Sequence, residues 1–440
     1  MKNLYHKIVP FRFRYGFPTF YNTHRHIMKS QFVSEGELYG EQQRSLKLLM
    51  EHVYYNIPYY GNLMTKLGVV PSDFNCSHQL KILPILTKQI IRDNYKDLIA
   101  TNIDQTKLKK FATSGSTGEP LQFVGLDEVY KKEAAFVLRA YKAHGATLYD
   151  KPSIWLRRYV PKEGEPFYQY DKELNRLYLS PYHLNNDTFL QYLELMDKSK
   201  ATTLSAYPSS AYIFALLCER FGITPKHIKY IHLASEKVLA DWRNKIQVVF
   251  DIAPKAHYGM VEKVSMFFQC EKCDYYHDSL EYGITELIPN GLGSCDVIGT
   301  GFLNWAMPFI RYKMNDTAIP IDPTTSTKCT CGRNLPLRVK DFDGRADDIL
   351  QTKTGYLPPV NFYTMMYKIA GITMFQIVQD SLEHFTVNIV TNGSYLKGNQ
   401  IRNGLIDRLG YGVKVDIKIV DQIERDPKTQ KIRCIVNNVK

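Results

Sequence analysis

The residues best suited to chemistry form a short loop at residues 113–120, with the sequence TSGSTGEP. Glycine lets a ligand approach the backbone closely, and successive backbone N–H groups in such a turn form a concavity that binds anions. The candidate donors are Thr113, Ser114, Gly115, Ser116, Thr117 and Gly118. The loop therefore indicates a polyphosphate site, and an ordinary surface turn rich in Ser, Gly and Pro is the alternative that it leaves open.

This loop differs from a Walker A motif. No lysine follows Gly118, and Pro120 removes a backbone donor where the motif needs one. The next segment, residues 121–124, has the alternation that predicts a strand. We therefore expect the loop to join two extended segments, as in a hairpin.

Four further groups of polar residues follow in order along the chain. Tyr258 and Gly259 offer an aromatic face and a glycine, and Glu262 adds a carboxylate nearby. Asp316, which we expect in a loop, suits a ribose diol because its carboxylate can accept both hydroxyl protons. The last two groups are GRADD at residues 344–348 and PKTQKIR at residues 427–433.

Four of the eight cysteines form two close pairs. Cys270 and Cys273 have the C-x-x-C spacing, and Cys329 and Cys331 have the tighter C-x-C spacing followed by glycine. Paired cysteines of this kind suit tetrahedral Zn²⁺ in a structural site. His277 is a substitute ligand, and four reduced cysteines without metal are the alternative.

Composition bounds the class of protein. A chain of 440 residues with 44% hydrophobic and 23% charged residues is globular, with two or three domains. The net charge of +12 attracts polyanions, yet no nucleic-acid module is recognisable. The basic, aromatic N-terminus lacks a secretory h-region, so a cytoplasmic location is expected, and contact between this segment and a membrane surface stays open.

Alternating strand and helix patterns over residues 153–258 predict a mostly parallel, layered α/β core. Thr87 and Asp127 are expected to cap helices, and the second helix should bury a stripe that includes Tyr130 and Tyr141. After Cys270 the pattern changes to short β segments. A polar turn at residues 341–345 is expected to precede a small α+β domain of about one hundred residues.

The ordered motifs resemble the adenylate-forming superfamily, in the branch of phenylacetate–CoA ligases and CapK-like proteins. The similarity extends over nearly the whole chain and includes the early segment LPILTK at residues 83–88. It implies a large N-terminal layered α/β domain with a β subdomain at residues 1–343, which binds the nucleotide. It also implies a small, mobile C-terminal α+β domain at residues 344–440.

The resemblance also assigns roles. The 113–118 loop would hold the β- and γ-phosphates of ATP, and Glu236 would line the nucleotide pocket. Tyr258, followed by Gly259, would stack on adenine, and Asp316 would bind the ribose hydroxyls.

Four more roles concern metal, charge and movement. Glu262 would ligate Mg²⁺, which prefers carboxylate oxygen and phosphate. Arg345 would approach the ribose or a phosphate, and Lys431 would stabilise the charge that develops when a carboxylate attacks the α-phosphate. Asp347 would be the hinge between the two domains.

The implied function is ATP-dependent, AMP-forming activation of a small-molecule carboxylic acid, followed by acyl transfer to coenzyme A or another acceptor, with capsule polysaccharide biosynthesis as one setting. Residues 207–209 lie where relatives shape the acyl pocket, a homodimer is compatible with the resemblance, and no nucleic acid is expected. Glu119 and Gln430 depart from the superfamily pattern. These two residues leave a degenerate nucleotide-binding or scaffolding protein as one alternative. The net charge and the cysteines leave a basic zinc protein that binds nucleic acid as another.

Overall fold

The computed structural model describes the chain except at residues 1–15, 113–120, 149–150, 160, 163, 182, 185, 292, 323–327, 346–349, 353–354, 358–361, 363–364, 367–368, 370, 392–397, 425–432 and 440. The loop at 113–120, the expected hinge Asp347 and Lys431 therefore lie outside the described residues. For Arg345 the backbone is described and the side chain is not.

A twelve-stranded mixed sheet is the centre of the fold, with the order β11-β12-β13-β14-β10-β9-β8-β7-β6-β3-β5-β4. Its strands are β3 (Ser153–Leu156), β4 (Tyr168–Asp171), β5 (Arg176–Leu179), β6 (Thr203–Ala206), β7 (Tyr230–Ala234), β8 (Lys255–Gly259), β9 (Met266–Cys270), β10 (Cys273–Asp278), β11 (Gly283–Pro289), β12 (Cys295–Gly301), β13 (Tyr312–Pro320) and β14 (Leu337–Arg345). From β5 through β3, β6 and β7 to β8 all neighbours are parallel. From β8 to β11 they are antiparallel. The expected change to antiparallel β structure after Cys270 is confirmed, but the strands are not short, because β10 to β14 have six to nine residues each.

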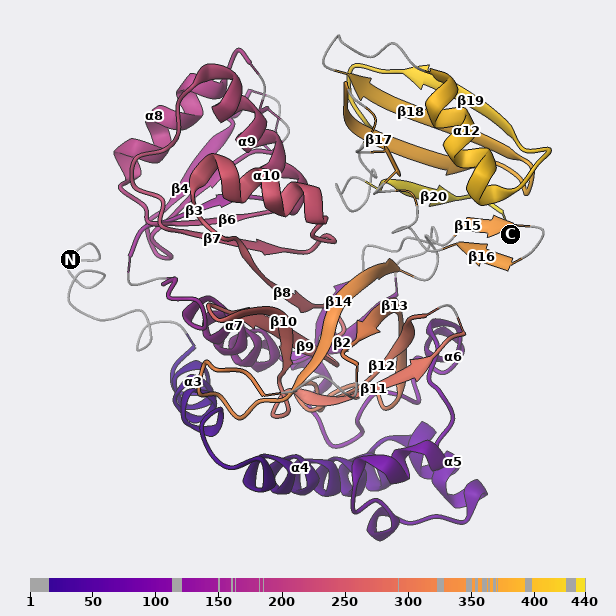
Figure 1. The fold of residues 1–440 in the computed structure, drawn as a ribbon. Helices are drawn as coiled ribbons and strands as arrows, with labels where there is room; N and C mark the ends of the chain where they lie inside the picture. Colours follow the sequence, from indigo (N-terminus) through magenta and orange to yellow (C-terminus); the bar gives the residue numbers. More distant parts are fainter. Residues whose placement is uncertain are drawn as a thin grey trace.

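Helices cover the parallel half of the sheet on both faces. One face carries apolar residues such as Ile154, Leu204 and Ile231, and α8 (Phe189–Ser199), α9 (Pro208–Phe221) and α10 (Ala240–Phe250) lie over it (Figure 1). The opposite face meets α7 (Asp127–Lys142), whose Tyr141 packs on His232 of β7. Burial of the apolar face supplies most of the driving force for this layer.

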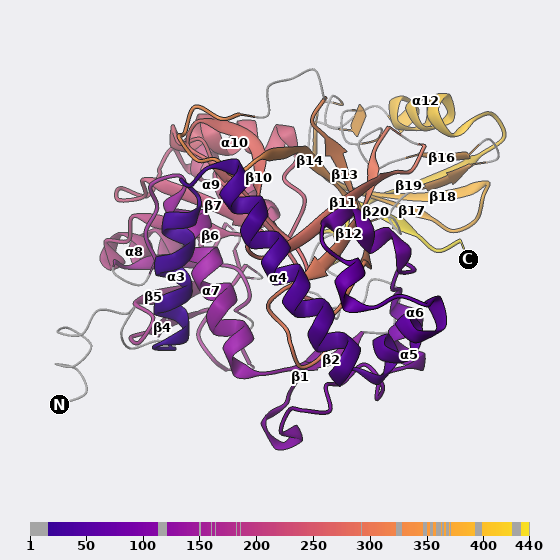
Figure 2. The same ribbon diagram turned by 90° about the horizontal axis from the view of Figure 1, so that it is seen from below.

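The first part of the chain is helical. It contains α3 (Thr19–Ser30), α4 (Glu35–Asn56), α5 (Pro58–Leu67) and α6 (Lys88–Asp93), with the 3₁₀ turns η1 (Pro71–Asp73), η2 (Ser77–Ile82) and η3 (Gln105–Lys107). Helix α3 lies beside α7, and α4 crosses below the sheet (Figures 1 and 2). Thr87 caps α6 by accepting from the Ile90 N–H, as expected. No helix in the described ranges is long and apolar enough to cross a bilayer.

A separate four-stranded sheet follows near the C-terminus, with the order β19-β18-β17-β20. Its elements are β17 (Ile372–Gln379), β18 (His384–Thr391), α12 (Gly398–Leu409), β19 (Lys414–Ile419) and β20 (Ile435–Asn437). The small hairpin of β15 (Leu350–Thr352) and β16 (Gly355–Leu357) precedes it (Figure 1). This arrangement confirms the expected small α+β unit.

Three local expectations are wrong. Asp127 is the first residue of α7 and not its cap; its carboxylate instead pairs with Lys109 and Lys131. Tyr130 is 42% exposed and so lies outside the buried stripe. Residues 341–345 form the end of strand β14 and not a polar turn, because β14 pairs with β13 up to the partners Asp316 and Arg345.

Candidate active site

Several candidate residues lie at the carboxyl ends of the parallel strands. In open α/β sheets, ligands bind outside this edge. Arg158 follows β3, Ser235 follows β7, and Lys263 lies just beyond β8, and these residues have φ values of 65°, 74° and 58°. Left-handed backbone at non-glycine residues costs free energy and concentrates at functional sites. The edge therefore combines the expected position with backbone strain.

Tyr258, Asp316 and Phe342 form one cluster beside this edge. The Tyr258 hydroxyl donates to Asp316 Oδ2 at 2.5 Å. Its ring stacks on Phe342 with centroids 3.7 Å apart and an interplanar angle of 9°. Asp316 belongs to β13 and not to a loop, and the backbone register places it opposite Arg345 of β14. Tyr258 and Asp316 thus come together although β8 and β13 are not adjacent in the sheet, and the Arg345 backbone lies opposite Asp316.

Glu262 lies three residues beyond β8 and is 9% exposed. Its Oε1 accepts a hydrogen bond from the Tyr312 hydroxyl at 2.9 Å. Within the described part of the chain no lysine or arginine forms an ion pair with it. A buried carboxylate without a cationic partner suits a divalent cation.

The two strands that flank residues 113–120 pair as a hairpin, as predicted. Strands β1 (Lys109–Ala112) and β2 (Gln122–Gly125) are antiparallel, and Ala112 pairs with Gln122. Phe111 stacks between Phe123 and Tyr130, with centroid distances of 5.1 and 4.7 Å. These contacts hold the two arms on which the loop begins and ends.

Glu236 lies at the edge of the sheet, within electrostatic range of Cys434 in the C-terminal unit. It is half-buried just after β7. The negative charge of Glu236 acts on Tyr207 and on Cys434, and burial is the main cause that raises the pKa of Cys434 to about 12. Cys434 lies three residues after Lys431 in the sequence. The C-terminal segment therefore approaches the edge that carries Glu236.

Sequence reasoning missed Phe342, Tyr312 and Arg311. The Arg311 guanidinium binds Glu286 with two hydrogen bonds of 2.9 and 3.0 Å and also donates to the Leu83 carbonyl. It thereby fixes the LPILTK segment against the start of β13. Phe342 lies between two aspartates in the sequence. An aromatic residue in such a polar segment was the one sequence feature that could have indicated a buried ring contact.

Three histidines, of which His144 and His232 are buried, form a chain behind the site. His144 Nε2 lies 2.8 Å from His232 Nδ1, and His232 Nε2 lies 2.6 Å from His257 Nδ1. Burial lowers the pKa of His144 to about 4 and that of His257 to about 3, and nearby cations contribute. The histidine chain is therefore neutral at physiological pH.

The lowered pKa of His144 predicts that the stability of the fold decreases in acid. A histidine that stays neutral in the fold stabilises it fully above pH 6.5, and that contribution is lost as the pH falls toward the folded pKa. For His144 the loss between pH 6.5 and pH 5 is about 2 kcal/mol. Denaturant unfolding at both pH values should show a smaller loss in His144→Gln than in the wild type. An equal pH dependence in wild type and His144→Gln, with exposed His78→Gln as control, would contradict this assignment.

The cysteine pairs meet at the β9–β10 turn. The Sγ atoms of Cys270, Cys273 and Cys329 lie 3.7, 3.5 and 3.6 Å from one another. His277 joins them, and the four ligand atoms all lie within 4.8 Å. Cys331 Sγ lies 3.6 Å from His277 Nε2. All five residues were candidate ligands in the sequence analysis. The four ligand atoms that lie closest together come from His277 and three of the four cysteines.

The geometry of this cysteine cluster fits Zn²⁺. A tetrahedral ion with Zn–S bonds near 2.3 Å would place its ligand atoms about 3.8 Å apart. His277 Nδ1 lies 2.9 Å from the Leu335 carbonyl, which is the arrangement that leaves Nε2 available to a metal. The hydrogen bond with Cys273 lowers the pKa of Cys270, and a thiolate is the form that binds metal.

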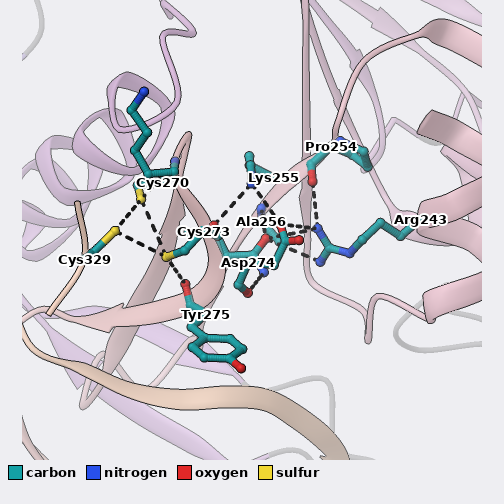
Figure 3. A network of polar contacts seen from close by, with 11 residues as sticks. Arg243, Pro254, Lys255, Ala256, Cys270, Cys273, Asp274, Tyr275 and Cys329 are labelled. Carbon is teal, nitrogen blue, oxygen red and sulfur yellow. Dashed lines mark hydrogen bonds and ion pairs between the residues drawn. The ribbon is translucent and has the colours of Figure 1, made fainter. Parts of the chain in front are cut away.

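The cluster also supports β8. Lys255, the first residue of β8, donates to the Cys273 carbonyl at 3.2 Å and to Asp274 at 2.8 Å. Arg243 reaches the same hairpin and donates to the Pro254 carbonyl at 2.8 Å (Figure 3). The cysteine hairpin therefore braces the strand that carries His257 and Tyr258.

The fold is known from solved structures. 2-Hydroxyisobutyryl-CoA ligase in the postadenylation state with 2-HIB-AMP matches with a TM-score of 0.72 and 14% identity, over 93% of this chain and 92% of that one. The chain has the fold of the adenylate-forming CoA ligases. The same enzyme in its thioesterification state, with 2-HIB-AMP and CoA, matches with a TM-score of 0.60 at 15% identity, over 94% and 92%.

Sequence comparisons agree. Protein CapK of Staphylococcus aureus is 23% identical over 418 residues, which is 92% of this chain and 90% of CapK. Phenylacetate-coenzyme A ligase of Pseudomonas putida is 24% identical over 353 residues, with 76% and 77% covered. The family model described as the CapK C-terminal domain matches residues 349–438. The resemblance to CapK and the phenylacetate–CoA ligases is thus confirmed.

Proposed function

We propose that this chain is an AMP-forming ligase that activates a carboxylic acid with ATP and transfers the acyl group to coenzyme A. The observation that carries the proposal is the assembly of Tyr258, Asp316 and Phe342 beside the edge where Glu262 and Glu236 also lie. An aromatic ring for a base, a carboxylate for a ribose and a carboxylate for a cation are the groups that a nucleotide needs.

The reaction has two steps. A carboxylate oxygen of the acid attacks the α-phosphorus of ATP, the bond to the bridging oxygen of the β-phosphate breaks, and pyrophosphate leaves. The thiol of coenzyme A, having lost its proton, then attacks the acyl carbonyl and AMP leaves. Relatives named as CoA ligases, and a ligase solved with both 2-HIB-AMP and CoA, support this order.

Each residue has a place in the first step. Thr113, Ser114, Gly115, Ser116, Thr117 and Gly118 bind the β- and γ-phosphates in the proposal. Tyr258 would stack on adenine, with Gly259 allowing close approach, and Asp316 and Arg345 would bind the ribose. Lys431 stabilises the charge between carboxylate and α-phosphate.

Magnesium fits Glu262 on the donor chemistry. A buried carboxylate with one hydroxyl partner is a hard oxygen ligand of the kind that Mg²⁺ takes together with phosphate. When bound, the ion would neutralise phosphate charge. Tyr312 orients the Glu262 carboxylate for that purpose.

Two further parts of the proposal concern structure and movement. A zinc ion held by Cys270, Cys273, Cys329 and His277, with Cys331 beside them, would lock the β9–β10 hairpin to the segment before β14. Residues 344–440 would form a C-terminal domain that turns about Asp347. In one pose it brings Lys431 to the site, and in the other it admits the thiol.

The test is acid-dependent release of pyrophosphate from ATP, measured with a panel of carboxylic acids. The proposal expects release only when an acid is present. A degenerate nucleotide-binding relative, which Glu119 and Gln430 favour, would bind ATP in calorimetry and yet release no pyrophosphate with any acid. Such a result would also remove a role in capsule biosynthesis that depends on ligase activity.

A further inference from the structure

Two of the buried arginines in the described part of the chain are paired with carboxylates. Arg139 is 1% exposed and binds Glu281 through two hydrogen bonds of 2.8 and 3.1 Å. Arg311 is 6% exposed and binds Glu286 in the same bidentate way. This agrees with the general rule that a charge removed from water needs an opposite charge.

Within the described ranges, Arg157 lacks such a partner. It is 3% exposed and lies directly after β3, at the carboxyl edge of the sheet. Its Nη2 donates a long hydrogen bond of 3.4 Å to the Tyr141 hydroxyl, and its guanidinium lies 4.2 Å from the centroid of the Trp155 ring. Its buried Nε has no hydrogen-bond partner, and no carboxylate forms an ion pair with it, among the described residues.

The described residues around Arg157 supply no carboxylate that pairs with it. Burial lowers the pKa of Arg157, and the positive charges of Arg158 and Arg176 lower it further. The histidine chain beside it is neutral. Arg157 is therefore a desolvated cation whose missing partner has the chemistry of an anion, and a guanidinium matches a carboxylate in two parallel hydrogen bonds.

The position of Arg157 separates it from the nucleotide residues. Successive side chains of a strand point to opposite faces, so His257 and Tyr258 of β8 lie on different sides of the sheet. Arg157 belongs to the side of His257, because Tyr141 contacts both Arg157 and the histidine chain. Gly259 is exposed on the His257 side, and among the described residues a Cβ added there would meet only Met266 Cγ, at 4.0 Å.

We propose that Arg157 binds a second anionic group of the acid, at the end remote from the carboxylate that is activated, so that the preferred substrates are dicarboxylic acids. The inference rests on the proposed function. The reacting carboxylate would lie near Tyr258 and Glu262, and the acid would pass the space at Gly259 to reach Arg157. An acid with a distal phosphonate shares this chemistry and serves as a separate arm of the test.

The first experiment compares matched acids of equal length: succinate with butyrate, adipate with hexanoate, and terephthalate with benzoate. Wild type should show a kcat/KM for the best dicarboxylate about 100-fold above that of its monocarboxylate, the size expected for a buried charge pair. Arg157→Met should lose this preference and keep its activity toward the monocarboxylate. Arg157→Lys should retain part of it, and exposed Arg44→Met should match wild type.

The second experiment measures binding without catalysis. The same dicarboxylate should raise the melting temperature of wild type and of Arg44→Met, and should not raise that of Arg157→Met. If dicarboxylates stabilise wild type through Arg157 while no acid releases pyrophosphate, the anion site at Arg157 stands, and the proposed function and the substrate assignment both fail. If pyrophosphate release is equal for both members of every pair and unchanged in Arg157→Met, the proposed function stands and the inference is overturned. A preference for 3-phosphonopropionate over succinate that depends on Arg157 supports the anion site and assigns it to phosphonate or phosphate.

Discussion

Replacing Lys431 with alanine should slow acyl-adenylate formation about a hundred- to a thousand-fold, the usual effect of removing one preorganised group that stabilises transition-state charge. The carboxylate and the α-phosphate are both anions, and the loop at residues 113–120 contains no basic residue to offset their repulsion. Lys431 is the cation that the superfamily resemblance assigns to this task. Pyrophosphate release in single-turnover experiments measures the step directly.

The second step separates a local effect from general damage. Lys431→Ala supplied with chemically prepared acyl-adenylate and coenzyme A should form the thioester at close to the wild-type rate, because Lys431 acts in the first step only. Lys428→Ala, in the same segment, should behave as wild type in both steps. Adenylation by Lys431→Ala at the full wild-type rate would contradict the role assigned to this lysine. Loss of both steps would indicate a folding defect instead.

Replacing Cys270 with serine should cost about 4–5 kcal/mol of stability, the range reached when a structural metal is lost. The purified wild type should contain one zinc ion per chain by elemental analysis, and the variant should contain almost none. Since Lys255 ties Cys273 to the first residue of β8, loss of the ion should also raise the KM for ATP through Tyr258 on the same strand.

Cys76→Ser is the matched control because Cys76 lies outside the cluster. It should keep both its zinc and its melting temperature. A wild-type protein purified without zinc, and unchanged in stability when zinc is added to the medium, would show that the cluster is a set of reduced thiols.

The layered α/β architecture could be predicted from the sequence because strand and helix periodicities there are strong. Ser153 to Leu156, Thr203 to Ala206 and Tyr230 to Ala234 are the predicted parallel strands, almost to the residue. The small C-terminal unit and the hairpin around the loop were also predictable. The strand at residues 341–345 could not be predicted, because the polar composition of this segment is typical of a turn. It forms a strand because it pairs with β13.

The candidate site could be predicted where it depends on motifs and not where it depends on tertiary neighbours. Tyr258, Asp316 and Glu262 stand in recognisable order, and the structure brings Tyr258 and Asp316 into contact. The roles of Phe342 and Tyr312 could not be predicted, because the sequence does not indicate which aromatic residues contact Tyr258 and these carboxylates. Arg157 is the clearest case: one arginine among many, whose lack of a carboxylate partner appears only when its neighbours are known.

The central claim is that the acid attacks the α-phosphorus of ATP, and transfer of oxygen tests it most directly. The substrate acid is labelled with ¹⁸O in both carboxylate oxygens, and the complete reaction with ATP and coenzyme A is analysed by mass spectrometry. The account predicts AMP that carries one ¹⁸O atom, together with unlabelled pyrophosphate. Label in inorganic phosphate with ADP as the nucleotide product, or AMP without label, would contradict it.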